Sequence, residues 1–374
     1  MQITDIKTTA LRLPEVKPIG DGIQDVLVVE VDTDEGITGI GEVHSSPYIA
    51  EAIIHAPMSH YAARGLRQIL IGRDPLDRET LWSDMYRMTS VFGRRGVTIH
   101  AMSGIDIALW DIAGKASGLS VHKLLGGSYR DQVRAYASVL MPESPEEAKE
   151  EVRRCIELGF AGIKLGWGPL ANSVKQVVAL AEAVRAEAGD DVDIMLDVGF
   201  GVNTVQAERL AKSIEALDIY FLEEPLSPDN LVGYGYLSAR TCVPIAAGEK
   251  ETTYWGFRDL IDIGGVQIAQ PDLARAGGFT ECVRIRDLAN RSGVHCIPHC
   301  WSSDILLGAT LQFAATIPDL PYVEFCTLDT PLRTSLCADP IRPRDGVLEI
   351  PDAPGIGIEL NRETMERYRY VGEV

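Results

Sequence analysis

Asp193-Ile194-Met195-Leu196-Asp197 and Ile219-Tyr220-Phe221-Leu222-Glu223 are two short apolar runs, and each ends on a carboxylate. Short apolar runs bounded by polar residues are typical of buried strands in a parallel sheet, where both faces are covered. The two terminal carboxylates lie 26 positions apart, as their numbers show. That interval has room for one helix between the strands, so the two runs predict consecutive βα units.

The same alternation of apolar runs and amphipathic helices extends in both directions along the chain. A helix is indicated after Ser144, because Ser144, Pro145 and Glu147 have the types preferred at its cap and first turn. Eight such units predict an α/β fold, a TIM-type (β/α)7β barrel over residues 126–345. The predicted strands are 134–139, 161–164, 193–197, 219–223, 244–249, 266–270, 294–298 and 322–325.

The first 125 residues mix strands and helices without a repeat. Residues 27–31 and 37–42 are apolar runs joined by a polar turn, which predicts a β-hairpin. Residues 97–117 carry apolar side chains at steps of three and four, which predicts a helix that ends near Gly118. An α+β region over 1–125 therefore precedes the barrel, and 346–374 forms a C-terminal segment.

Composition and charge exclude several classes of function. The chain has 374 residues, and 54 acidic side chains against 35 basic ones give a formal net charge of −19. Such a charge repels nucleic acid and anionic membranes. The N-terminus lacks the basic and apolar regions of a signal peptide, and seven scattered cysteines fit reduced thiols. We therefore expect a soluble cytoplasmic protein with no nucleic-acid or membrane partner.

A charged or ionisable residue ends nearly every predicted barrel strand. For any single one, a helix cap or a turn former is the simpler interpretation. Seven in succession favour an active site, because the carboxyl ends of barrel strands meet at the face where such sites are built. The seven residues are Lys164, Asp197, Glu223, Glu249, Asp272, His299 and Glu324.

Three of these residues predict a metal site. Asp197, Glu223 and Glu249 would place three carboxylates side by side, which repel one another unless a divalent cation neutralises them. Oxygen ligands without His or Cys favour Mg²⁺ over Zn²⁺. Strand alternation predicts that the neighbouring Glu224 points to the other face.

The remaining strand ends predict acid–base chemistry. Asp272 and His299 follow neighbouring strands, so the carboxylate could orient the imidazole and raise its basicity. Lys164 would be costly to bury without an anionic partner. We therefore interpret His299 as the candidate base and Lys164 as a charge beside the substrate or the metal.

These residues carry a family resemblance: the chain resembles the enolase superfamily, mandelate racemase subgroup, over its whole length. The marks are Ser103 to Asp111, Glu223-Glu224-Pro225, Gly248-Glu249, and the Asp272/His299 pair with Glu324. The resemblance implies an N-terminal domain that caps the barrel, to which residues 346–374 return. It also implies a homo-oligomer between a dimer and an octamer, one Mg²⁺ per subunit, and abstraction of the proton alpha to a carboxylate. A protonated Glu324 would help to stabilise the resulting charge.

Two departures from the family pattern bear on the reaction. Gly166 stands where two-base members carry a second lysine, and Gly199 stands where the family often has an asparagine. One base favours elimination, so the expected activity is that of a hydro-lyase that dehydrates an aldonate or aldarate to a 2-keto-3-deoxy acid. A sugar-lactone cycloisomerase is the first alternative and a racemase or epimerase the second. A metal-binding barrel without catalytic activity is the alternative from another class.

Substrate selection is expected at loops over the barrel mouth. The resemblance points to residues 18–23 and 44–48, whose polar side chains suit a polyol. The partner is therefore expected to be a small-molecule carboxylate. The candidate substrate-contacting residues are His44, Ser45, Tyr48, Arg94, Trp167 and Trp301.

Overall fold

The N-terminal part of the chain contains a three-stranded antiparallel sheet. The computed structural model describes residues 1–167, 173–199 and 202–372. The strands are β1 (Ile3–Arg12), β2 (Asp25–Thr33) and β3 (Thr38–Val43), in the order β1-β2-β3. Asp32 pairs with Thr38 beside the turn, which confirms the predicted hairpin.

The long helix of this region lies directly on the sheet. Helix α4 (Val97–Ser117) ends at Gly118, whose φ of 68° is left-handed, as the sequence predicts. A Cβ atom added at Gly41 would lie 2.0 Å from the carbonyl oxygen of Gly104. The absence of a side chain on β3 therefore allows the close approach of α4. The shorter helices are α1 (Pro47–His55), α2 (Leu66–Leu70), α3 (Arg78–Thr89) and α5 (Val121–Leu124).

All eight predicted barrel strands are present. Neighbours pair in parallel in the order β11-β4-β5-β6-β7-β8-β9-β10, and no ladder joins β10 to β11 within the described ranges. The strands are β4 (Gln132–Leu140), β5 (Gly162–Gly166), β6 (Asp193–Asp197), β7 (Ile219–Glu223), β8 (Ile245–Ala247), β9 (Ile268–Ala269), β10 (His295–Cys296) and β11 (Val323–Cys326).

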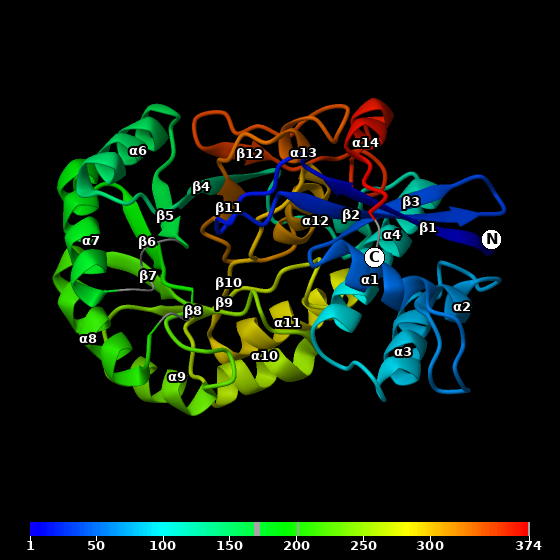
Figure 1. Ribbon diagram of the computed structural model, residues 1–374, viewed down its shortest axis with the longest axis horizontal. Helices are drawn as coiled ribbons and strands as arrows, with labels where there is room; N and C mark the ends of the chain where they lie inside the picture. The colour runs from blue at the N-terminus through cyan, green and yellow to red at the C-terminus, as the bar shows by residue number, and fades with distance from the viewer. Residues whose placement is uncertain (168–172, 200–201, 373–374) are drawn as a thin grey trace.

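One helix follows each of the first seven strands, so the architecture is the predicted (β/α)7β barrel. Figure 1 shows α6 to α9 around the outer side of the strands, at the end of the molecule opposite the N-terminal sheet. The helices are α6 (Pro145–Glu157), α7 (Val174–Ala188), α8 (Thr204–Ile214) with a 3₁₀ turn (Glu215–Leu217), α9 (Leu231–Ser238), α10 (Thr253–Asp262), α11 (Gly278–Ser292) and α12 (Asp304–Ala314).

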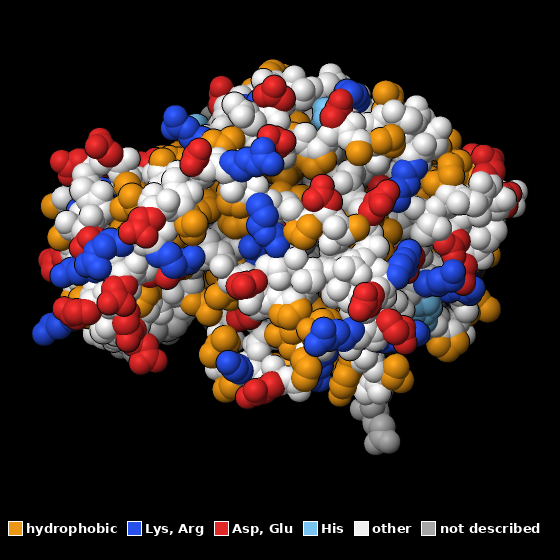
Figure 2. All heavy atoms as spheres, turned by 90° about the horizontal axis from the view of Figure 1, so that it is seen from above, with side chains coloured by type: hydrophobic (Ala, Val, Ile, Leu, Met, Phe, Trp, Pro, Cys, Tyr) orange, Lys and Arg blue, Asp and Glu red, His pale blue; other side chains and the backbone are white. Residues whose placement is uncertain are grey.

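The end of the chain returns to the N-terminal sheet. After α13 (Pro331–Thr334), strand β12 (Val347–Glu349) pairs antiparallel with β4, and α14 (Arg362–Tyr368) packs near β1. The backbone N–H of Tyr370 donates to the carbonyl of Ala10 at 2.9 Å. On the face seen in Figure 2, acidic and basic side chains are interspersed and do not gather into one basic patch.

Buried polar contacts join the N-terminal region to the barrel. Helix α11 begins at Gly278 after Gly277, which offers no side-chain cap. Asp106 on α4 supplies the cap, because its carboxylate accepts from the Thr280 backbone N–H at 3.0 Å and from the Thr280 hydroxyl at 2.6 Å. Ser103 Oγ accepts from the Gly277 N–H at 2.8 Å. Helix α4 therefore satisfies N–H groups at the start of a barrel helix.

Replacing Asp106 by Ala should destabilise the protein by about 2–3 kcal/mol, because it removes a buried cap and leaves Thr280 unsatisfied. Urea unfolding checks this value. Asp77→Ala is the matched control, since Asp77 precedes α3 without capping it through its side chain. We expect that control to change the free energy of unfolding by less than about 0.5 kcal/mol. Equal effects of both substitutions would contradict the assigned cap.

Two further expectations concern membranes and thiols. Across the described parts of the chain, none of the helices combines the length and the apolar character that a bilayer crossing requires. All seven cysteines are free, as the sequence predicts, and six of them are buried.

Candidate active site

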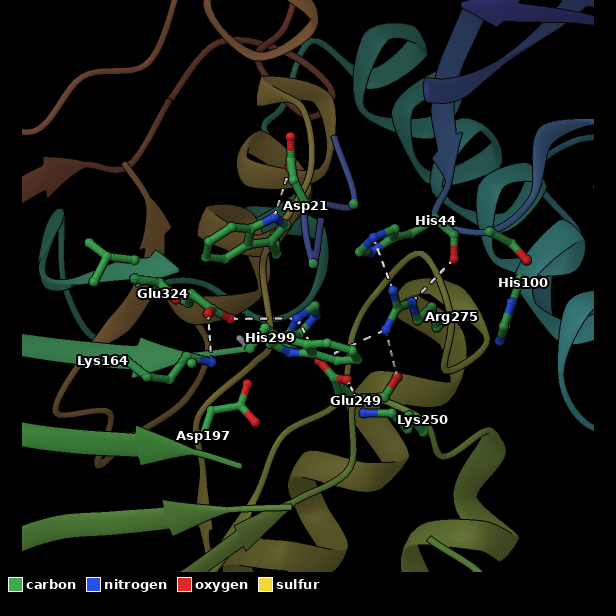
Figure 3. Close-up of a pocket in the computed structure, with 18 of the residues that line it drawn as sticks. Asp21, His44, His100, Lys164, Asp197, Glu249, Lys250, Arg275, His299 and Glu324 are labelled. Atoms are coloured by element: carbon green, nitrogen blue, oxygen red, sulfur yellow. Dashed lines mark hydrogen bonds and ion pairs between the residues drawn. The ribbon is translucent and has the colours of Figure 1, made fainter. Parts of the chain in front are cut away.

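The strand ends converge on one cavity of about 470 Å³, a volume suited to a small molecule. The register explains this convergence, because Gly166 at the end of β5 pairs with Asp197 at the end of β6. Asp197 in turn pairs with Glu223 at the end of β7. Lys164, Asp197, Glu249, His299 and Glu324 all line the cavity (Figure 3).

His299 and Asp272 form a hydrogen-bonded pair. His299 Nδ1 lies 2.8 Å from Asp272 Oδ2, and Asp272 is fully buried. Burial alone would raise the pKa of Asp272, but contacts with two histidines hold it well below its usual range, so the carboxylate accepts. Nδ1 of His299 therefore carries the proton, and Nε2 is the nitrogen that lies nearest Glu249, at 2.9 Å.

The pKa of His299 is raised to about 10. Burial acts in the opposite direction, but the nearby carboxylates of Glu249 and Glu324 and the hydrogen bond to Asp272 outweigh it. The imidazolium is therefore strongly stabilised in this pocket. The surrounding carboxylates therefore favour the form that His299 would have after it has accepted a proton from a substrate.

Lys164 lies between two carboxylates. Its Nζ atom is 2.9 Å from Glu223 Oε2 and 2.7 Å from Glu324 Oε1, and the side chain is buried. Burial disfavours the charged lysine, but the two carboxylates raise its pKa well above the usual value. Lys164 is thus a fixed positive charge on the pocket wall.

The expectation of a protonated Glu324 is wrong for this structure. Although burial raises its pKa, the positive charges of Lys164 and His299 outweigh burial and lower it. Glu324 also accepts from the backbone N–H of Cys300 at 2.8 Å. The residue is therefore an ionised acceptor that ties the lysine to the loop carrying His299.

The three predicted metal ligands are buried carboxylates, and two of them, Glu223 and Glu249, contact cationic side chains. Burial raises the pKa of both Asp197 and Glu223 to about 7, an effect that Lys164 partly offsets. Glu249 contacts Lys250 and His299. Three buried carboxylates of this kind form a donor set that suits a hard divalent cation.

Glu224 does not point away from the site, contrary to the strand-alternation prediction. Its φ of 43° is left-handed, so the backbone leaves the extended conformation immediately after β7. The side chain is buried and contacts Lys250, which also contacts Glu249. A fourth carboxylate therefore lies beside the predicted metal ligands.

A different group has closer ligand atoms. Those of His44, Asp272 and His299 lie within 4.8 Å of one another, and among the described residues only this group combines enough potential ligands at that spacing. Both imidazoles approach the same Asp272 oxygen through Nδ1, at 2.9 and 2.8 Å. In these contacts each Nδ1–H donates to Asp272, so neither Nδ1 has a free lone pair for a metal ion. The group is therefore a hydrogen-bonded cluster.

Four predicted substrate residues line the cavity, together with part of the predicted loop 18–23. They are His44, Ser45, Trp167 and Trp301, and the loop contributes Gly20, Asp21 and Gly22. This loop contacts the barrel side of the cavity, since Trp301 Nε1 lies 3.4 Å from Asp21 Oδ1.

Tyr48 and Arg94 are not among the lining residues of this cavity, and their predicted contacts with substrate stay predictions. Pro47 begins α1, and Tyr48 on its first turn packs edge-on against Tyr370 of the C-terminal segment, with ring centroids 5.6 Å apart. Arg94 is exposed in the turn before α4.

Sequence reasoning missed three cationic or imidazole side chains of the pocket: His100, Lys250 and Arg275. Arg275 lies three residues after Asp272, and Lys250 directly follows Glu249, so both share a strand-end loop with a predicted site residue. His100 lies one turn into α4, and no local pattern shows that this turn faces the barrel.

The two glycine departures have structural consequences. A Cβ atom at Gly166 would lie 2.7 Å from Asp197 Cβ, so a lysine at 166 would require Asp197 to move. Gly199 has a left-handed φ of 53°, and its N–H donates to Asp197 Oδ1 at 2.9 Å. Gly166 therefore leaves the space that Asp197 occupies, and the backbone of Gly199 donates to its carboxylate.

The fold and the site define a class: barrel enzymes with an α+β domain over the mouth and an acid–base pair beside buried carboxylates. Residues 147–364 match the enolase C-terminal domain-like family, and residues 9–126 match the N-terminal domain of mandelate racemase / muconate lactonizing enzyme. The chain therefore belongs to the mandelate racemase/muconate lactonizing enzyme family of the enolase superfamily.

Relatives of the chain include cycloisomerases and dehydratases. D-galactarolactone cycloisomerase of Agrobacterium fabrum is 35% identical over 92% of this chain and 91% of its own. Arabinonate dehydratase of Saccharolobus solfataricus is 32% identical over 95% of this chain and 93% of its own. The structure of 3,6-anhydro-D-galactonate cycloisomerase from Zobellia galactanivorans superposes with a TM-score of 0.90 at 31% identity, covering 99% of this chain and 100% of that one.

Proposed function

We propose that the chain removes the proton alpha to the carboxylate of a sugar acid and eliminates the β-hydroxyl, giving a 2-keto-3-deoxy acid. The observation that carries this proposal is the His299–Asp272 pair, whose imidazole lines the same cavity as Lys164 (Figure 3). Gly166 leaves no side chain where a second base would stand, which favours elimination over inversion at the alpha carbon.

His299 acts as the base in this proposal. Nδ1 is held by Asp272, so Nε2 receives the alpha proton. The imidazolium formed in this way can deliver its proton to the departing hydroxyl, which then leaves as water. Lys164, held by Glu223 and Glu324, presents a positive charge to the carboxylate on which negative charge develops.

The proposed cofactor is one Mg²⁺ held by Asp197, Glu223 and Glu249. The oxygen-only donor set, its burial and the raised pKa values of Asp197 and Glu223 support this assignment. The ion would supply charge neutralisation for the ene-diolate that forms on proton removal. We favour this group over His44, Asp272 and His299, because the latter is already joined by hydrogen bonds.

A sugar-lactone cycloisomerase is the second candidate. The named relatives include two cycloisomerases, and that reaction also needs one base while expelling a ring oxygen. The pocket residues named above serve either outcome, because proton removal is common to both. Whether the chain is a dehydratase or a cycloisomerase depends on whether a β-hydroxyl or a ring oxygen of the substrate lies beside the His299 imidazolium.

A substrate screen tests the proposal. The Mg²⁺-loaded protein is incubated in D₂O with aldonic acids, aldaric acids and their lactones, and NMR follows alpha-proton exchange, keto-acid formation and the C2 epimer. We expect a 2-keto-3-deoxy product from at least one acid. Ring isomerisation alone would support the cycloisomerase, and accumulation of only the C2 epimer would contradict the single-base assignment.

The proposal includes a cytoplasmic homo-oligomer. Seven free cysteines support a reducing compartment. Large apolar side chains remain exposed in the N-terminal region, among them Tyr61 at 74% and Val91 at 70%, and these could be covered by a second copy. Light scattering after size exclusion measures the number of subunits.

A further inference from the structure

The cavity continues past His299 to a second group of basic side chains. In Figure 3, Lys164 and Asp197 lie on one side of His299, and His44, Arg275 and His100 lie on the other. All of these residues line the same cavity. A substrate whose reacting end lies near Lys164 therefore has its distal end facing the second group.

Arg275 keeps hydrogen-bonding capacity for a ligand. Nε donates to the carbonyl of His44 at 3.2 Å, Nη1 to the carbonyl of Glu249 at 3.3 Å, and Nη2 to His44 Nε2 at 3.0 Å. A guanidinium has five N–H groups. Within the described part of the chain, one N–H on each terminal nitrogen is therefore left over, and such a pair matches the two oxygens of a carboxylate.

The charge of Arg275 is only partly balanced. The nearest carboxylate oxygens, on Asp272 and Glu249, lie 3.9 and 4.0 Å away, beyond hydrogen-bonding distance, and the side chain is 20% exposed. Asp272 is also engaged by two histidines. The guanidinium therefore remains a positive group that can attract an anion.

The two histidines of this wall are neutral. Arginine can only donate, so His44 Nε2 accepts from Arg275, and the proton of His44 lies on Nδ1, facing Asp272. Burial and the charge of Arg275 lower the pKa of His44 to about 4 and that of His100 to about 3. The ring nitrogen Nδ1 of His100 is buried without a hydrogen-bond partner.

We propose that Arg275, with His100 and His44 beside it, binds a second carboxylate at the distal end of the substrate, so that the preferred substrates are aldaric acids or their lactones and not aldonic acids. This inference rests on the proposed function for the reacting end of the substrate. Arg275 is then the specificity-determining residue, and His100 offers a further polar contact. His44 holds the guanidinium in place and joins it to Asp272.

Matched substrates test the preference. A hexaric acid and the hexonic acid of the same configuration differ only at the distal end, where one has a carboxylate and the other CH₂OH. We expect the wild-type protein to have at least a 10-fold higher kcat/KM for the hexaric acid. Arg275→Met should lower kcat/KM for the hexaric acid about 100-fold, mostly through KM, and by a smaller factor for the hexonic acid.

Two further variants separate binding from folding. His100→Phe should reduce the preference without loss of stability, because no hydrogen bond of its ring is present among the described residues. Arg275→Lys should restore part of the preference by restoring the charge. Arg94→Met is the control for a lost arginine charge, since Arg94 is exposed and does not line the cavity. It should leave both substrates unaffected.

Calorimetry with unreactive acids makes the test independent of turnover. In Mg²⁺ buffer the wild-type protein should bind adipate more tightly than hexanoate, and Arg275→Met should remove the difference. If adipate is preferred but no sugar acid reacts, the distal site stands and the proposed reaction fails. Equal use of both substrates by the wild type, or equal losses for both in Arg275→Met, would overturn the distal carboxylate site.

Discussion

His299→Asn should lower turnover by about three to four powers of ten and abolish alpha-proton exchange in D₂O. The asparagine side chain can still hydrogen-bond to Asp272, but it has no group that takes up a proton. Substrate binding should change little, because the imidazole contributes proton transfer and not the main charge of the pocket. Single-turnover NMR in D₂O measures exchange, and product inhibition measures the remaining affinity.

The chain offers a matched control for this substitution. His295 lies four residues earlier, on β10, and its side chain is exposed, so His295→Asn should leave turnover unchanged. Lys164→Ala is the informative comparison, because Lys164 also carries a proton and lines the cavity at the end where Asp197 lies. Exchange that persists in His299→Asn and disappears in Lys164→Ala would reverse the roles assigned to these two residues.

The fold could be predicted because each barrel strand has a recognisable local sequence pattern. Each strand is a short apolar run followed by a helix, and in the case of α6 the cap residue Ser144 marks the start of the helix in the sequence. The interval between Asp197 and Glu223 is one βα unit. The two residues are therefore paired at the ends of neighbouring strands in the sheet. The same spacing brought the predicted site residues to one end of the barrel.

The distal part of the pocket could not be predicted in this way. His100 belongs to a helix of the N-terminal region and Arg275 to a barrel loop, and they meet because α4 docks on α11 through Asp106 and Thr280. No periodicity in either segment specifies that docking. Tyr48 belongs to a predicted substrate loop, but the sequence pattern did not indicate that its side chain packs against Tyr370.

The sequence pattern also could not predict the charge state of Glu324 or the orientation of Glu224. The protonated state expected of Glu324 depended on a resemblance, whereas its pKa depends on the contact with Lys164 at 2.7 Å. Likewise, alternation fails at Glu224 because the strand ends one residue earlier and φ becomes positive. Single-residue backbone changes of this kind are set by the packing around the strand end.

Glu223→Gln should abolish tight Mg²⁺ binding and reduce activity to background, because it removes the central carboxylate of the proposed triad. Isothermal titration with Mg²⁺ measures the binding, and thermal unfolding with and without Mg²⁺ measures its contribution to stability. A ligand at 100 times its Kd stabilises the folded state by about 2.7 kcal/mol. The wild-type protein should show an increment of that kind, and Glu223→Gln should not.

The metal-free stability of this variant separates a lost ligand from a damaged fold. Glu223 is fully buried and its pKa is raised to about 7 by burial, so its ionised form is unfavourable there even with Lys164 at 2.9 Å. A neutral amide avoids that cost, and Lys164 retains Glu324 as a partner. Metal-free Glu223→Gln should therefore unfold at or above the wild-type temperature. Glu366→Gln, the same chemical change on the exposed face of α14, should keep the Mg²⁺ increment. Full turnover of Glu223→Gln in Mg²⁺ buffer would contradict the triad, and the cation would then have to be sought at other ligands of this pocket.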